Sequence, residues 1–323
     1  MGLADLASVA SLLMCPRCGS GLVRAGDTFR CSSPSCANNA PGAFPMVGRW
    51  PALVDFERSI VRRDQLASAP HGERRRWSIA RLPPRLRRLW RPSNRVAARN
   101  VERLLRLLPG PSPLVLVIGG GTLGNGVGAI YRDRRARILG FDLYGSPLTQ
   151  LIADAHQIPL AGETVDAVVV QAVLEHVLDP SRVVGEIRRV LKPGGLVYAE
   201  TPFLQQVHAG PLDFVRYTSS GHRYLFRSFD EVAAGPVAGA GTQLLWSLDH
   251  LVRGLLRSEL AGKLARALFS WLRHLDRLVG PAYAMDDASA YYFLGRRADR
   301  ELSPREIVDY YRGAQRAEPA GKS

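Results

Sequence analysis

The sequence predicts an α/β fold in which a doubly wound parallel sheet follows a small N-terminal metal-binding unit. Two observations predict the sheet: apolar strands without polar alternation, and amphipathic helical stretches between them. A third observation, four cysteines in two close pairs within residues 15–36, predicts the N-terminal unit. In a doubly wound sheet, ligands lie at the carboxyl ends of the strands.

The composition bounds the class of protein. The chain has 323 residues, 46% of them hydrophobic, which suffices for one large or two modest domains. It contains no apolar run long enough to cross a membrane and no basic signal region at its N-terminus, so we expect a cytoplasmic location. The net charge of +14 comes almost entirely from arginine and favours phosphate-bearing partners, although an arginine-rich coding bias explains it equally well.

Shifts in composition divide the chain into regions. We expect a zinc-binding unit at 1–57, an arginine-rich linker and leading helix at 58–110, the α/β domain at 111–300 with a helical insertion at about 247–280, and a C-terminal tail at 301–323. The second region holds fifteen arginines and a Pro83-Pro84 break, which indicates short helices in a linker.

Hydrophobic periodicity gives the elements of the sheet in order. Apolar runs predict strands at Leu114–Ile118, Arg137–Phe141, Val165–Val170, Gly195–Glu200 and Ala288–Leu294. Helical spacing predicts helices at Asn94–Leu108, at Pro180–Leu191 and within Leu244–Val279. In the last stretch Leu264, Leu268, Trp271, Leu272, Leu275 and Leu278 share one face. We expect that face to pack into a core, with an anionic membrane as the alternative contact.

A glycine-rich turn follows the first strand of the sheet. Gly119, Gly121 and Gly124 have the spacing G-x-G-x-x-G, which lets the backbone approach a ligand closely. Asp142 ends the second strand, where a carboxylate can accept both hydroxyls of a ribose. Dinucleotide sites and adenosyl sites both use this arrangement, so these residues alone leave the cofactor open.

The stretch from Ala153 to Pro202 resembles the type 11 group of class I methyltransferases, which use S-adenosylmethionine (SAM). It contains Asp154-Ala155 before a strand, the element LEHV at 174–177, and the turn LKPGG at 191–195. In the family's count a short third strand lies just before Asp154, Val165–Val170 is the fourth strand and Gly195–Glu200 is the fifth. The resemblance covers roughly residues 112–205 and implies a Rossmann-like seven-stranded sheet with SAM as the cofactor. It implies that the glycine turn holds the methionine part of SAM and that Asp154 and Ala155 lie at the adenine; we add Gln171 to the cofactor-binding residues.

Val117 departs from the family pattern, and His176 has two possible roles. The family usually has an acid two residues before the first glycine, to hold the amino end of SAM, and this chain has Val117 there. His176 in the LEHV element is a candidate base, but we favour a structural role for it beside the cofactor loop.

The four cysteines have the spacing of a zinc site. Cys15, Cys18, Cys31 and Cys36 form C-x2-C and C-x4-C pairs separated by twelve residues, which suits one tetrahedral zinc ion with a closed, structural coordination shell. The residues Ala43–Glu57 that follow resemble the end of the zinc-ribbon family that includes small activator subunits of methyltransferases. The resemblance implies a role in stability or substrate presentation.

The loop after the fifth strand carries the candidate acceptor site. His208, Asp213, Arg216, Tyr217 and His222 crowd a stretch at a strand's carboxyl end. Their H-x-x-P-x-D-x-x-R-Y-T pattern resembles methyltransferases that act on glycans and cell-surface polysaccharides. We assign His208 as the general base and Asp213 as the residue that orients it. Arg216, Tyr217 and His222 are assigned to acceptor binding, with an Asp213–Arg216 ion pair above a packed Tyr217 as the alternative.

Three functions remain open from the sequence. The first is O-methylation of a small molecule, sugar or lipid-linked glycan, with peripheral contact to an anionic membrane. The second is methylation of RNA, which the net charge of +14 would serve. The third is a non-catalytic SAM-binding partner, for which Val117 is the motive. No N-P-P-Y element follows the fourth strand, which argues against an adenine or glutamine acceptor.

Overall fold

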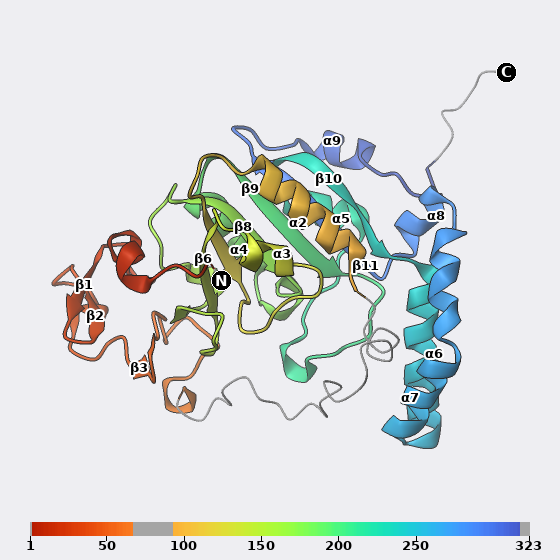
Figure 1. Cartoon of the computed structure of the whole chain (residues 1–323), viewed down its shortest axis with the longest axis horizontal. Coiled ribbons are helices and arrows are strands. Elements are labelled where there is room, and N and C mark those ends of the chain that lie inside the picture. Colours follow the sequence, from red (N-terminus) through yellow and green to blue (C-terminus); the bar gives the residue numbers. More distant parts are fainter. Residues whose placement is uncertain (1, 67–92, 317–323) are drawn as a thin grey trace.

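A seven-stranded sheet with the order β10-β11-β9-β8-β5-β6-β7 forms the centre of the protein (Figure 1). A computed structural model describes residues 2–66 and 93–316. The parallel strands are β5 (Leu114–Ile118), β6 (Arg137–Asp142), β7 (Leu151–Ile152), β8 (Val165–Gln171) and β9 (Leu191–Pro202). The antiparallel strands β11 (Ala290–Arg297) and β10 (Phe229–Ala238) extend the sheet beyond β9. The predicted fold class is confirmed.

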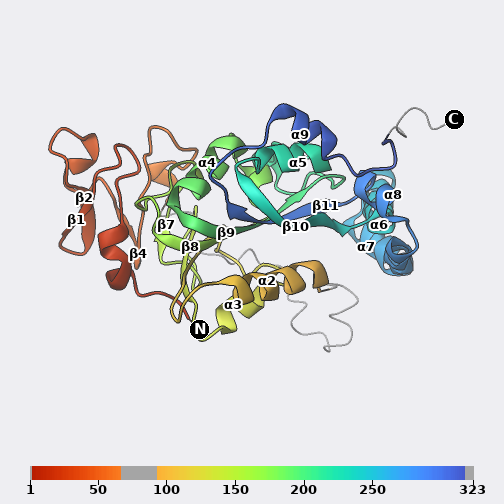
Figure 2. The same ribbon diagram turned by 90° about the horizontal axis from the view of Figure 1, so that it is seen from above.

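Helices cover both faces of this sheet, as Figure 2 shows. Alternate strand residues such as Val115, Val169 and Tyr198 are buried together with residues of α2 (Arg95–Leu107) and α3 (Gly128–Arg132). The residues between them, such as Leu116 and Val168, are buried on the opposite face with α4 (Pro180–Val190) and α5 (Ser219–Leu225). Burial on both faces explains why the strands read as unbroken apolar runs.

The observed elements follow the predicted ones closely, with one strand missed. Strand β10 has no clear apolar run because it contains Gly235 and Pro236, and its register with β11 shifts at two points. Proline is tolerated there because β10 is an edge strand. The short helix α9 (Pro304–Asp309) follows β11.

The N-terminal unit packs against the opposite edge of the sheet, next to β7 (Figure 2). Its elements are η1 (Leu6–Leu12), β1 (Leu22–Ala25), β2 (Thr28–Cys31), η2 (Ala37–Asn39), β3 (Met46–Val47) and β4 (Trp50–Pro51). The Leu53 amide donates to the Ile152 carbonyl oxygen over 2.8 Å. The indole of Trp50 donates to the carbonyl oxygens of Ser146 and Thr149. Main-chain pairing of this kind covers the otherwise open edge of β7.

A helical insertion joins β10 to β11. It consists of α6 (Ala240–Leu256), α7 (Glu259–Leu268), η8 (Ser270–Arg277) and α8 (Pro281–Asp286), and α6 and α7 form a hairpin that stands beside the sheet (Figure 1). The expected core packing of its apolar face is wrong for most of that face. Leu272 is buried, but Leu264, Leu268, Trp271 and Leu278 are exposed.

The arginine-rich linker lies mainly outside the described residues. Residues 67–92, which include the Pro83-Pro84 break, belong to the part of the chain that the structure does not describe. The described part contains the short 3-10 helix η3 (Arg63–Gln65) and helix α2. Helix α2 begins where predicted, because the side chain of Asn94 accepts a hydrogen bond from the Ala97 amide.

Candidate functional site

The glycine turn forms a close-fitting cradle at the carboxyl end of β5. Gly119 has φ +72°, and a Cβ added there would lie 2.3 Å from a methyl carbon of Val173. A Cβ on Gly121 would lie 2.6 Å from Asp142 Oδ2, and one on Gly124 would lie 2.0 Å from Gln171 Oε1. The predicted glycines therefore bring the backbone against two polar side chains, and no larger residue would allow this approach.

Asp142 lies directly beside this cradle. Its Oδ2 accepts a hydrogen bond from the Gly121 amide at 2.8 Å, and its Oδ1 accepts one from the Leu143 amide at 2.7 Å. Burial raises the pKa of Asp142, and the two amides partly offset that effect. Each carboxylate oxygen keeps a second lone pair, so Asp142 retains the capacity to accept ribose hydroxyls.

A polar network that the sequence did not predict lies on the other side of the cradle. Glu200 of β9 is buried and accepts hydrogen bonds from the hydroxyl of Tyr198, from Gln171 Nε2 at 2.7 Å and from Asn94 Nδ2 at 3.0 Å. Gln171 Nε2 also donates to the Asn125 carbonyl oxygen, while its Oε1 is buried and has no hydrogen-bond partner within residues 2–66 and 93–316. That unsatisfied acceptor faces the cradle and suits an ammonium group.

Asp154 is buried at the end of β7 and is already hydrogen-bonded. Its Oδ1 accepts from the amide and from Nδ1 of His156, at 2.9 and 2.6 Å, and its Oδ2 accepts from Ser59 Oγ at 2.5 Å. The neighbouring Ala155 is also buried. Burial alone would raise the pKa of Asp154, but the hydrogen bonds from His156 and Ser59 lower it on balance. Ser59 belongs to the segment after the N-terminal unit, so that segment reaches the predicted adenine end.

A second cluster gathers next to the acceptor loop, around Glu175. This carboxyl group is fully buried, and among the described residues neither of its oxygens has a hydrogen-bond partner. Its Oε1 lies 3.7 Å from His176 Nε2 and 3.8 Å from His208 Nε2. The Nδ1 of His176 lies 2.7 Å from the Leu212 carbonyl oxygen, which can only accept, so Nδ1 carries the proton and Nε2 is left as an acceptor.

His208, like His176, has acceptor groups beside its Nδ1 and Glu175 beside its Nε2. Its Nδ1 lies 3.5 Å from Asp213 Oδ2 and 3.4 Å from the Gln206 carbonyl oxygen, two groups that favour a proton on Nδ1. Its Nε2 then faces Glu175 as an acceptor, and 36% of the side chain is exposed. Three acceptors thus converge, and no described residue places a donor between them. No sequence pattern indicated the part played by Glu175. Such a cluster is stabilised by taking up a proton.

The other predicted residues of the acceptor loop form an ion pair, pack against the core or are buried. Arg216 forms an ion pair with Asp213, which lowers the pKa of that carboxyl, and donates from Nε to the Gln205 carbonyl oxygen. The backbone amide of His208 donates a hydrogen bond to Asp213 Oδ2 at 3.0 Å. Tyr217 packs against the core. His222 is 3% exposed, lies 3.2 Å from Thr201 Oγ1, and has a pKa that burial lowers to about 3.

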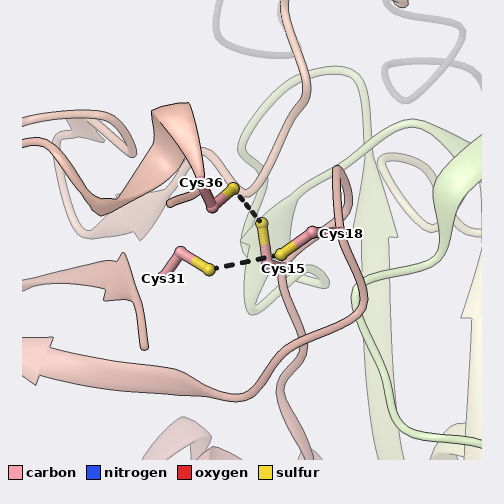
Figure 3. Close-up of side chains that lie close together, drawn as sticks. All are labelled: Cys15, Cys18, Cys31 and Cys36. Atoms are coloured by element: carbon pink, nitrogen blue, oxygen red, sulfur yellow. Dashed lines mark hydrogen bonds between the residues drawn. The ribbon is translucent and has the colours of Figure 1, made fainter. Parts of the chain in front are cut away.

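The four cysteine sulfurs converge at one point of the N-terminal unit (Figure 3). Cys15 Sγ lies 3.9 Å from Cys36 Sγ, and Cys18 Sγ lies 3.4 Å from Cys31 Sγ, and all four lie within 4.8 Å of one another. A tetrahedral zinc ion with Zn–S distances of about 2.3 Å requires sulfur separations of about 3.8 Å. The arrangement fits such an ion, and the Ser33 amide and Asn38 Nδ2 donate to two of the sulfurs.

Part of the chain is similar to a known protein family. Residues 119–199 match the family model described as a methyltransferase domain. The match begins at the first glycine of the cradle and includes Asp142, Asp154 and Glu175. Together with the sheet order, it supports a SAM-dependent methyltransferase as the class of protein.

Particular relatives are similar over part of the chain. Over 108 residues it is 32% identical to an uncharacterized 37.1 kDa protein in transposon TN4556 of Streptomyces fradiae, a match to 29% of this chain and 31% of that protein. Among solved structures it is similar to the cyclase SpnF (18% identity, TM-score 0.41, 63% of this chain and 82% of that chain). It is also similar to geranyl diphosphate C-methyltransferase from Streptomyces coelicolor A3(2) (15% identity, TM-score 0.40, 63% of this chain and 77% of that chain).

We predict that Glu175→Gln stabilises the fold at alkaline pH. Burial raises the pKa of Glu175 from 4.5 to about 7, so the folded protein holds a proton that the unfolded chain releases between these values. The carboxyl group therefore weakens folding progressively as the pH rises through this window, by about 3 kcal/mol once it is fully ionised. Urea unfolding should show that gain for the variant near pH 8, and far less near pH 5.

The exposed Glu102 on α2 offers the matched control for this experiment. Glu102→Gln removes one carboxylate without touching the cluster, and it corrects for the change in net charge. An equal gain for Glu175→Gln at both pH values would show that the proton is held elsewhere.

Proposed function

We propose that this protein transfers the methyl group of SAM to a hydroxyl of a small-molecule, sugar or lipid-linked glycan acceptor. The observation that carries the proposal is the pairing of the glycine cradle with the Glu175–His176–His208 cluster, which provides a cofactor site and a proton acceptor. Both lie at the carboxyl ends of parallel strands, where ligands bind in such sheets.

The residues of the cradle suit SAM. Asp142 has free lone pairs for the ribose hydroxyls, and Asp154 has one on Oδ2 for the adenine amine beside the bond from Ser59. Gln171 Oε1 suits the ammonium of the methionine part, with Glu200 as a nearby negative charge when ionised. We infer that these two residues replace the acid that the family has at the position of Val117.

The chemistry requires removal of one proton. SAM supplies an electrophilic methyl group; its C–S bond breaks as a C–O bond forms to the acceptor, and a neutral thioether leaves. The acceptor hydroxyl loses its proton to His208 Nε2, the most exposed acceptor of the cluster. Asp213 keeps the proton of His208 on Nδ1, and Glu175 stabilises the charge that develops on the ring.

We further propose that the N-terminal unit holds one structural zinc ion through Cys15, Cys18, Cys31 and Cys36. Four thiolates close the coordination shell, so the ion would stabilise the fold and leave no position for a substrate. Cys15 and Cys31 are buried in the same cluster as Leu13 and Phe44 and as residues of the sheet. Zinc would therefore also support the docking of this unit on β7.

We expect Gly121→Ala to weaken SAM binding by at least about tenfold, because its Cβ would displace Asp142 and the Tyr144 hydroxyl, which would lie 2.5 Å away. Isothermal titration with SAM gives the affinity. The matched control is Gly185→Ala in α4, where an added Cβ meets no atom within 4 Å. Equal affinities for the two variants would contradict the assignment of the cradle.

The acceptor is tested with methyl-labelled SAM and a lysate of the host, separated into lipid, polar glycan, protein and RNA fractions. Label in the lipid or glycan fraction is the expected result. His208→Ala should then lower turnover by about 100-fold or more with unchanged SAM affinity, because it removes the base. His274→Ala on η8 is the control. Label in RNA would overturn the proposal, and SAM binding without any label would indicate a non-catalytic partner.

Zinc analysis of the purified protein should give one ion per chain, as four thiolate ligands in one cluster require. Cys18→Ser should lose most of the zinc and make residues 1–57 sensitive to protease, while Ser35→Ala in the same unit should change neither. Full zinc content in the Cys18→Ser variant would refute the four-cysteine site.

A further inference from the structure

The α6–α7 hairpin has its apolar residues on the outside. Leu260, Leu264 and Leu268 follow one another at every fourth position of α7 and are 66%, 60% and 72% exposed. On α6, Leu251 and Leu255 are likewise four positions apart and exposed. Among the described residues, ten of the twenty exposed large apolar side chains lie between 244 and 283. A soluble surface rarely collects leucines in this way without a partner.

The buried side of the hairpin, in contrast, carries a charged group. Asp249 is 2% exposed and accepts two hydrogen bonds from Arg253, at 2.7 and 3.1 Å. Arg266 of α7 lies 4.0 Å from the same carboxylate. Gly262 lets the helices approach, because a Cβ there would lie 2.4 Å from Arg253. A buried carboxylate of α6 thus faces an arginine of its own helix and one of α7, while the leucines of the hairpin remain exposed.

We propose that this leucine face docks on an anionic lipid bilayer and that the methyl acceptor is carried by a lipid of that bilayer; the second part rests on the proposed function. Charge selects this occupant. Arg257 and Arg277 are exposed beside the leucines, whereas the exposed Glu259 is paired with Lys263. Two copies of the chain meeting by this face would bring those cations together. Anionic headgroups attract them.

The aromatic residues and the helix lengths fit the same geometry. Trp271 and Tyr283 are 54% and 68% exposed, and such amphipathic rings favour the interface between headgroups and acyl chains. In the described part of the chain no helix has both the length and the apolarity to cross a membrane. Docking would therefore place the hairpin in the plane of the surface.

One contact links this face to the acceptor loop. Gln206 Nε2 donates to Ser247 Oγ of α6 at 3.0 Å, two residues before His208. The loop itself exposes Val207, Leu212 and Phe214. A docked hairpin would thus hold the candidate base next to the headgroup region, where the sugar or phosphate part of an amphipathic lipid lies.

Co-sedimentation with vesicles tests the proposal. The wild-type chain should bind vesicles of equal parts phosphatidylcholine and phosphatidylglycerol, bind less as salt is added, and bind phosphatidylcholine alone weakly. The variant Leu260→Ser/Leu264→Ser/Leu268→Ser should lose at least about tenfold in partition, because three apolar contacts are removed. The control Val23→Ser/Leu107→Ser/Val308→Ser removes three exposed apolar side chains elsewhere and should bind like the wild type.

SAM titration of all three proteins separates this test from the proposed function. Unchanged SAM affinity in the hairpin variant shows that it is folded, and lost vesicle binding in that variant supports the docking surface whatever the acceptor is. Equal vesicle binding by the two triple variants would overturn the proposal. A wild-type dimer that the hairpin variant dissociates would overturn it too, since a second copy would then cover the face.

Discussion

The parallel pairing of β5 with both of its neighbours is the constraint on which the candidate site depends. Ile118 pairs with Phe141 on β6 and with Val170 on β8, so the three strands end at one edge of the sheet. Residues that are far apart in the chain follow those ends and meet there. The main-chain pairing of the strands thus brings the glycine cradle, Asp142 and Gln171 to one place, and hydrogen bonds of the Asp142 and Gln171 side chains to this turn add to it.

Burial then gives two glutamates at this edge different properties. Glu200 is buried but accepts hydrogen bonds from three side chains, which fix its position beside the glycine cradle. Glu175 is fully buried and has no hydrogen-bond partner in the part of the chain that the structure describes. An unsatisfied buried carboxyl group costs free energy, and such groups persist mainly where their chemistry is used. The first glutamate suits positioning and the second suits proton transfer.

What the sequence could predict is what depends on neighbours along the chain. The strands, the glycine turn and the cysteine pairs are local patterns, and the structure has the strands and the glycine turn within a few residues of the expected positions. The Glu175–His208 and Gln171–Glu200 contacts join residues 33 and 29 positions apart, and no periodicity encodes them. The exposed leucine face was misjudged for a related reason: a helical repeat reveals an apolar face but not what covers it.

The two additions to the sheet lie at its opposite edges, and the way each is packed indicates a different task. The N-terminal unit shares its buried core with the sheet, and the segment that follows it reaches the site through the Ser59–Asp154 hydrogen bond, at the predicted adenine end. The hairpin beside β10 and β11 buries Asp249, leaves its leucines exposed, and reaches the site through Gln206–Ser247, at the acceptor end. A unit packed into the core suits the support of a cofactor site. An element with an exposed apolar face suits the uptake of an acceptor from a lipid bilayer.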